Sequence, residues 1–244
     1  MVEQGAQVPV GARGGAIQGI FGVDRSLFVR RLEGHGKALG VRFRAGCFRP
    51  FWGAPVSQLS DRVVPATRVF GSLAEKTRQA IMCAETGDDM TSHAESLLFS
   101  ALPERDPVAE QAADLVALII SDSSLRRVDQ LAGASGLSAR SLQRLFADYV
   151  GVGPKWVMRR ARLHEASERA GSGEPVDWAA LAADLGYADQ AHLSRDFTAT
   201  IGVPPSRYLA GPLRCLGAWL PGRDWCLAGL GALGAWLGLV ALGG

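Results

Sequence analysis

The sequence predicts an α+β protein, in which a small strand-rich or mixed N-terminal domain precedes an all-α domain of two helix-turn-helix units joined by a long linker helix. Three observations support this prediction. Short β-prone runs bounded by glycine or proline occupy about the first 72 residues, amphipathic helical spacing then takes over, and the pattern Leu-x-Arg-x-Phe occurs twice in the C-terminal half. The 244 residues are 48% apolar and 20% charged, which suits two modest globular domains.

The N-terminal domain is expected to span residues 1–102. Its β-prone runs lie at 26–34, 38–46 and 62–71, and an amphipathic helix pair follows from about residue 72. Three arginines surround Cys47 in the second run and just after it. They could bind an anionic effector, but a solvated strand face is the more economical interpretation. These arginines are Arg42, Arg44 and Arg49.

A connector is expected at residues 103–124. Pro107 suits the first turn of a helix, where a missing backbone N–H costs nothing. The apolar residues that follow are spaced at three and four, which places Val108, Ala112, Leu115 and Ile119 on one stripe. The connector is therefore predicted to be a helix with one buried face.

Two copies of one motif then follow in the all-α region, expected at residues 125–210. "LAGASGLSARSLQRLF" begins at Leu131 and "LAADLGYADQAHLSRDF" begins at Leu181. Both contain Leu-Ala, then a glycine, a short turn and Leu-x-Arg-x-Phe. The copies are offset by 50 residues before the turn and 51 after it. The chain therefore duplicates one structural unit, with one extra residue in the second turn.

The spacing of the first copy predicts a helix-turn-helix. Gly136 can take the left-handed conformation that ends a helix, and Ser138 is placed to cap the next one. Leu142 and Phe146 are four residues apart and share a buried face, whereas Arg144 points away from both.

Side chains that suit DNA bases are expected on the outward face of each second helix. Arginine can donate two hydrogen bonds to guanine, and glutamine can pair with adenine, in the major groove. We expect base contacts from Arg140, Gln143 and Arg144 in the first unit and from Gln190, His192, Ser194 and Arg195 in the second. Between the units, one helix is expected from Pro154 to Ala170, and its length of about 25 Å suits two units that bind about one DNA turn apart.

The segment from about Leu125 to Leu209 resembles the AraC/XylS-type DNA-binding domain, and "LAADLGYADQAHLSRDFTATIGVPPSRY" carries most of the resemblance. The resemblance implies a transcriptional regulator, not an enzyme, whose partner is a double-stranded DNA operator. Ala191 stands where many members have a polar side chain. The resemblance further implies a small-molecule effector at the N-terminal domain, a homodimer, and contact with RNA polymerase if the protein is an activator. "GKALGVRFRAGCFRPFWGAPVSQLSDRVV" resembles the N-terminal domain of a poorly characterised subset of these regulators, which usually begins with additional strands. This difference suggests a missing first part or a start codon assigned too late.

Charge is distributed unequally between the two units. Residues 126–162 have a balance of +6 and residues 163–210 a balance of −4, although the whole chain carries only +2. Because phosphate contacts supply most sequence-independent affinity, we hypothesise that the first unit anchors the protein on DNA and the second mainly adjusts specificity.

Other classes of protein fit less well. A methyl-accepting repair enzyme would need a cysteine cluster with zinc-ligand spacing, whereas the four cysteines are scattered and are expected to be free thiols in a reducing cytoplasm. No metal or other cofactor is expected. A protein-interaction module without DNA binding remains an alternative. No export signal is recognised at the N-terminus. The cysteines are Cys47, Cys83, Cys215 and Cys226.

The segment 211–244 is apolar and glycine-rich, and its last twenty residues carry no charge. That length could cross the hydrocarbon core of a membrane. Three interpretations remain open: a tail anchor that makes the chain a membrane-tethered regulator, an apolar segment packed on the N-terminal domain, and a non-native extension.

Overall fold

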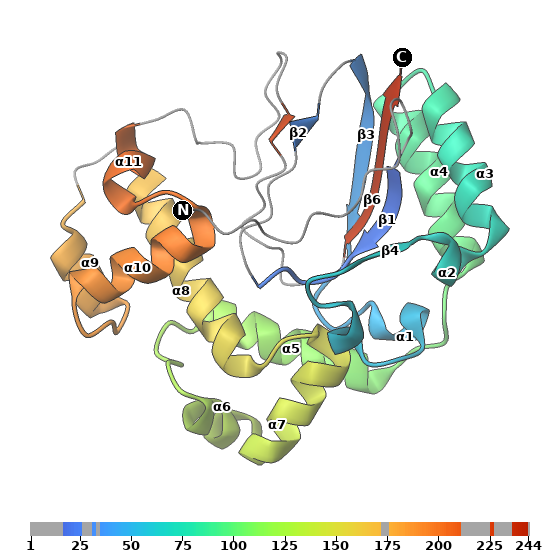
Figure 1. The fold of residues 1–244 in the computed structure, drawn as a ribbon. Coiled ribbons are helices and arrows are strands. Elements are labelled where there is room, and N and C mark those ends of the chain that lie inside the picture. Colours follow the sequence, from blue (N-terminus) through green and yellow to red (C-terminus); the bar gives the residue numbers. More distant parts are fainter. Residues whose placement is uncertain are drawn as a thin grey trace.

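A four-stranded antiparallel sheet organises the N-terminal part of the computed structural model, which describes residues 17–25, 31–32, 35–171, 176–210, 225–226 and 236–243. The strand order is β3-β6-β1-β4 (Figure 1). A separate pair joins β2 (Arg31–Leu32) to β5 (Trp225–Cys226). The strands of the large sheet are β1 (Ile17–Phe21), β3 (His35–Arg42), β4 (Val63–Pro65) and β6 (Trp236–Gly243).

The α+β class is confirmed, but the predicted β-prone runs are only partly strands. The run at 62–71 holds the three residues of β4 and then the short helix α2 (Thr67–Phe70), because Phe70 turns inward to join a buried cluster with Ile20 and Phe48. Most of the run at 26–34 lies outside the described residues. Helix α1 (Arg49–Trp52) and the 3-10 turn η1 (Val56–Leu59) connect β3 to β4.

Strand β6 comes from the C-terminal segment and lies inside the sheet. It pairs with β1 on one side, where Gly238 is opposite Gly19, and with β3 on the other, where Leu239 is opposite Leu39. Of the three interpretations of the tail, this pairing corresponds to an apolar segment packed on the N-terminal domain. Most of residues 211–235 lie outside the described part. Within the described ranges, none of the helices is long and apolar enough to cross a membrane.

The predicted helix pair is α3 (Ser72–Cys83) and α4 (Gly87–Ser100), which covers one face of the sheet (Figure 1). Ile81 and Ala94 are buried there against Leu39 and Val41, two residues that alternate along β3 and so share a face. Thr86 and Asp89 form a capping box that starts α4, with Asp89 N donating to Thr86 Oγ1 at 3.1 Å.

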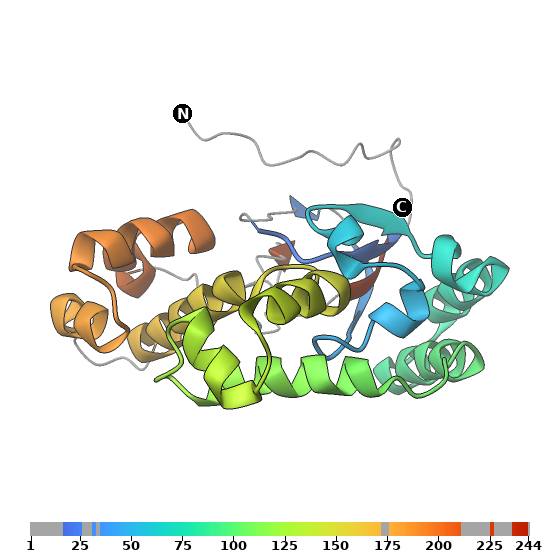
Figure 2. The same ribbon diagram turned by 90° about the horizontal axis from the view of Figure 1, so that it is seen from below.

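The connector is helix α5 (Pro107–Ser121), with Pro107 in its first turn, as predicted. Asp106 is its N-cap. The predicted buried stripe is wrong at one residue. Val108 is 42% exposed, and Ala109 takes its place beside Ala112 on the buried face, since the cap sets the rotation of the first turn. Figure 2 shows α5 running along the molecule from α4 to the C-terminal helices.

The C-terminal part is all helical, as predicted. Its central element α8 spans the distance between two helical units (Figure 1), and it extends one residue beyond the predicted end at Ala170. One side of α8 contributes Val157 and Met158 to the first buried cluster, and further along Leu163 and Ala166 join the second. The helices are α6 (Val128–Ser135), α7 (Ala139–Leu145), the π-helical turn η2 (Phe146–Val150), α8 (Pro154–Gly171), α9 (Trp178–Asp184), α10 (Gln190–Ile201) and α11 (Pro205–Ala210).

The first cluster also contains residues from the N-terminal part. Val23 and Ala45 are buried in it with Ala112 and Val116 of α5 and with Phe146 of the first helical unit. Helix α5 therefore packs into the core of the first unit, and the N-terminal part shares that core.

Candidate nucleic-acid interface

The first helix-turn-helix has the turn that its sequence predicts. Helix α6 ends at Gly136, whose φ of 70° is left-handed and favours glycine. Ser138 caps α7, since its Oγ accepts a hydrogen bond from Ser141 N at 3.1 Å. These two features fix the angle at which α7 leaves the turn.

Helix α7 buries its apolar residues and exposes its polar ones. Leu142 and Phe146 are completely buried, as predicted from their spacing of four. The three expected base-contacting residues are all exposed. Neither arginine makes a hydrogen bond or an ion pair with another residue in the part of the chain that the structure describes. The three residues are Arg140, Gln143 and Arg144.

The second unit repeats this arrangement with different caps. Asp177 caps α9, and Asp189 caps α10 by accepting a hydrogen bond from His192 N at 2.7 Å. Leu193 and Phe197 are completely buried, as their counterparts are in the first unit. The duplicated pattern therefore has the same structural consequence in both copies.

The outward face of α10 is less uniform than expected. Gln190, His192 and Arg195 are exposed, but Ser194 is half-buried. The ring of His192 also packs edge-on against Tyr187, with centroids 5.2 Å apart, and Arg195 Nε lies 3.4 Å from the carbonyl oxygen of Ala191 one turn earlier. Three of the four expected residues are therefore exposed.

Several arginines of the basic stretch bind the second unit instead of facing outward. Arg159 on α8 pairs with Asp196 on α10, with Nε 2.8 Å from Oδ2. Arg162 lies over the ring of Tyr187 at 5.0 Å and donates to the carbonyl oxygen of Leu185. The sequence did not predict these contacts, because the spacing of Arg159 and Arg162 on one helix does not identify the residues that they reach in the next unit.

Two further basic residues are also engaged within the protein. Arg126, which precedes α6, donates to the carbonyl oxygen of Asp184 at 2.5 Å. Arg160 is only 8% exposed, and its burial lowers the pKa of its guanidinium to about 10, so that it stays charged at neutral pH. The balance of +6 therefore overstates the charge that the first unit presents outward.

The N-terminal part contacts the first unit directly after α7. Arg49 Nε lies 2.9 Å from Asp148 Oδ1, and its guanidinium lies over the ring of Tyr149 at 5.7 Å. Ser60 Oγ donates to the carbonyl oxygen of Gly151 at 2.6 Å, at the end of the π-helical turn. The preferred interpretation of a solvated strand face is therefore wrong for Arg49, which lies on α1 and joins two parts of the chain.

Arg44 and Arg42 differ from Arg49 and from each other. Arg44 pairs with Asp114 on α5 at 3.0 Å, and both side chains remain mostly exposed. Arg42 is exposed and makes no hydrogen bond or ion pair within the described ranges.

The cysteines among the described residues are dispersed. Cys47 and Cys83 are free thiols, as predicted, and burial raises the pKa of Cys47. Cys215 and the side chain of Cys226 lie outside the described part. No group of three or more potential metal ligands comes together within the described ranges.

Two family models match parts of this chain. The model of a family described as "Helix-turn-helix domain" matches residues 131–211, and that of a "Domain of unknown function (DUF6597)" matches residues 2–65. A similar solved structure is a transcriptional regulator from Chromobacterium violaceum, described as containing an AraC-type DNA-binding domain. It is 23% identical, the match covers 39% of this chain and 86% of that one, and the TM-score is 0.37.

Proposed function

We propose, for a chain that belongs to the AraC/XylS-type transcriptional regulators, that α7 and α10 enter successive major-groove faces of one DNA operator. Regulators of this type bind DNA, and they are generally not enzymes.

The observation that carries the proposal is the common orientation of the two second helices. In each, the Leu and Phe of the repeat are completely buried, whereas the arginine between them is exposed. A solvated surface helix needs no such repetition. The matched arginines Arg144 and Arg195 are exposed, and each helix also exposes a glutamine, at positions 143 and 190. These side chains supply hydrogen-bond donors and acceptors that base edges in the major groove require.

The roles proposed for the individual residues follow from their exposure. Arg140, Gln143 and Arg144 would contact bases from α7, where their side chains are exposed. Gln190, His192 and Arg195 would do so from α10. Ser194 would contribute less, because its side chain is half-buried.

The first unit would supply most of the affinity for DNA, because of the basic side chains that it leaves available and not because of its net charge. Arg159 and Arg162 contact the second unit, and Arg160 is buried in the protein. Arg140, Arg144 and the exposed Lys155 remain available to DNA in the first unit. On α10, Arg195 is the single basic residue. More cations facing DNA give more phosphate contacts and a steeper dependence on salt.

The N-terminal domain is proposed to control these units as a sensor or as a dimerisation surface. Its contacts with the first unit support this, since Val23 and Ala45 share a core with α7, and Arg49 pairs with Asp148 immediately after it. A small-molecule effector and a second copy of the chain are the partners proposed to act through it. RNA polymerase is a further proposed partner if the protein is an activator.

Selection of bound duplexes from a random library tests the proposal. Two half-sites about one helical turn apart are the expected result, with binding that falls steeply as salt rises. Sequence-independent binding, or selection of one half-site alone, would contradict the proposal that both helices read bases. No binding to any duplex would favour the protein-interaction alternative.

A further inference from the structure

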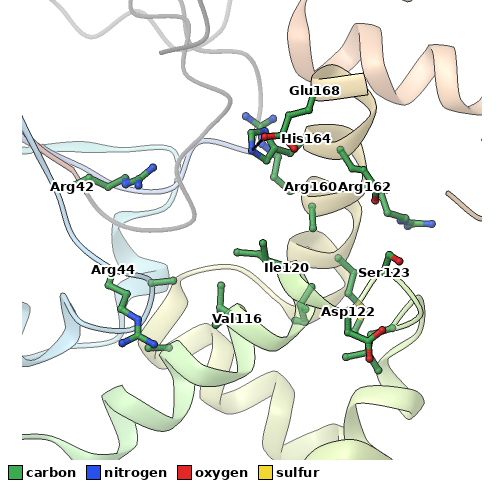
Figure 3. Close-up of a pocket in the computed structure, with 18 of the residues that line it drawn as sticks. Arg42, Arg44, Val116, Ile120, Asp122, Ser123, Arg160, Arg162, His164 and Glu168 are labelled. Carbon is green, nitrogen blue, oxygen red and sulfur yellow. Dashed lines mark ion pairs between the residues drawn. The ribbon is translucent and has the colours of Figure 1, made fainter. Parts of the chain in front are cut away.

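A cavity of about 470 Å³ lies where three parts of the chain meet: the end of β3, the C-terminal half of α5 and the middle of α8 (Figure 3). Its volume falls within the range of about 300–1,000 Å³ that is typical of small-molecule sites. The cavity is separate from the outward faces of α7 and α10, none of whose residues line it.

The part of the cavity formed by α5 is mainly apolar. Val116 and Ile119 are buried there, whereas Ile120 is 53% exposed and extends into the space, as Figure 3 shows. Phe43 and Met158 line the sides. An apolar group that covers an exposed isoleucine removes apolar surface from water, which makes its binding more favourable.

Cationic side chains lie at two sides of this apolar surface. Arg42, from the end of β3, extends toward the space and makes no hydrogen bond or ion pair with other described residues (Figure 3). Arg160 lines the cavity from α8 and is only 8% exposed. Arg162 also belongs to the lining, but its guanidinium is engaged on Tyr187.

The acidic residues of the lining have partners of their own. Glu165 pairs with Arg169 at 2.5 Å, and Glu168 lies 3.4 Å from His164. Asp122 accepts hydrogen bonds from the backbone and hydroxyl of Ser124, which lower its pKa. These local contacts leave Arg42 as the charged group best placed to meet a ligand.

We propose that this cavity binds a small organic carboxylate with an apolar body, its carboxylate near Arg42 and its body against α5. For its effect on DNA, the inference rests on the proposed function. Helix α5 packs into the core of the first unit, and α8 joins both units, so a ligand that touches both helices and β3 favours one arrangement of the three. Ligand binding itself does not depend on the proposed function.

Calorimetric titration of the full chain with octanoate, octanol and acetate tests the inference. Octanoate is expected to bind, and Arg42→Gln is expected to weaken its binding about ten- to hundredfold, as loss of a charge-assisted hydrogen bond predicts. Octanol and acetate are expected to bind more weakly, because octanol lacks the carboxylate and acetate lacks the apolar body. Arg62→Gln removes another exposed arginine that does not line the cavity and is expected to change nothing.

A second variant tests the cavity independently, in case Arg42→Gln misfolds. Ala117 is exposed and lines the cavity, so Ala117→Trp should fill the space and reduce octanoate binding without disturbing the buried core. Thermal unfolding and DNA binding without octanoate are measured on every variant. Absence of octanoate binding, equal binding of octanol, or full binding by Arg42→Gln would each overturn the inference. Octanoate binding by a protein that does not bind DNA would refute the proposed function while supporting the cavity.

Discussion

Arg159 on α8 and Asp196 on α10 form an ion pair that joins the linker helix to the second helix-turn-helix unit. Only 18% of the Asp196 side chain is exposed, which sets this pair apart from an ordinary surface contact. The neighbouring Arg162 contacts Tyr187 and Leu185. Together these contacts hold the second unit on the helix that positions it.

Asp196→Asn is expected to lower the free energy of unfolding by about 1–2 kcal/mol, because Arg159 loses its charged partner in a partly enclosed site. We also expect the substitution to weaken binding to a duplex with two half-sites more than it weakens binding to a duplex with one half-site. Denaturant unfolding and DNA titration measure the two effects. Asp184→Asn is the matched control, since Asp184 is 64% exposed and pairs with Arg169 at 3.3 Å. Equal losses in both variants would argue against a special role for the enclosed pair.

The unequal roles proposed for the two units predict a difference between equivalent arginines. Arg144→Ala is expected to weaken operator binding by about 1–3 kcal/mol, and Arg195→Ala by less. Competition titrations at several salt concentrations measure both. Arg105→Ala, which removes an arginine paired with Glu110 outside both units, should leave binding unchanged. A larger loss from Arg195→Ala would overturn the hypothesis that the first unit anchors the protein.

Two left-handed glycines provide a test of the contact between the N-terminal part and the first unit. Gly136 has no neighbour within 4 Å of an added Cβ, whereas a Cβ at Gly151 would lie 3.2 Å from Ser60 Oγ and 3.2 Å from Val56 Cγ1. Alanine at either position costs about 1 kcal/mol in backbone strain. Gly151→Ala is expected to cost more, because it also displaces η1. Thermal unfolding compares the variants, and equal costs would show that the contact adapts freely.

The stability of the N-terminal part is expected to fall as pH rises from about 4 to 6. Burial, together with repulsion from Asp61, raises the pKa of Asp24 to about 6. The folded state therefore binds this proton more tightly than the unfolded state, and stability is lost as the carboxyl ionises. Asp24→Asn should raise the free energy of unfolding at pH 8 by about 1 kcal/mol, since water still screens part of the repulsion, and should change little at pH 4.

Urea unfolding at the two pH values checks this expectation. Glu104→Gln, which changes an exposed carboxyl group, is the control and should show no such difference. A gain from Asp24→Asn that is the same at pH 4 and pH 8 would exclude ionisation of Asp24 as its cause.

The helical units were predictable because local rules determine them. Gly136 and Ser138 predict the turn, and a spacing of four places Leu142 and Phe146 in the core. The outward side chains follow from the same geometry. Whether they contact bases stays a prediction, because spacing fixes direction but not the partner.

The remaining features depend on contacts between distant residues. Nothing in the spacing of Arg159 or Arg126 reveals that they reach the second unit, and Val23 and Ala45 join a core formed mainly by residues more than 60 positions away. The glycine-rich C-terminal run was equally ambiguous. Its residues 236–243 pair between β1 and β3, and a continuous apolar run cannot by itself distinguish such a strand from a membrane segment.

The π-helical turn η2 connects the N-terminal part directly to the helix that carries Arg144. Asp148, which Arg49 holds, is four residues beyond Arg144, and therefore about one helical turn from it. No flexible tether intervenes, since Phe146 is completely buried between them. A small rotation of α1 against η2 would therefore move Arg144, the arginine that we propose contacts DNA, without passing through the rest of the fold.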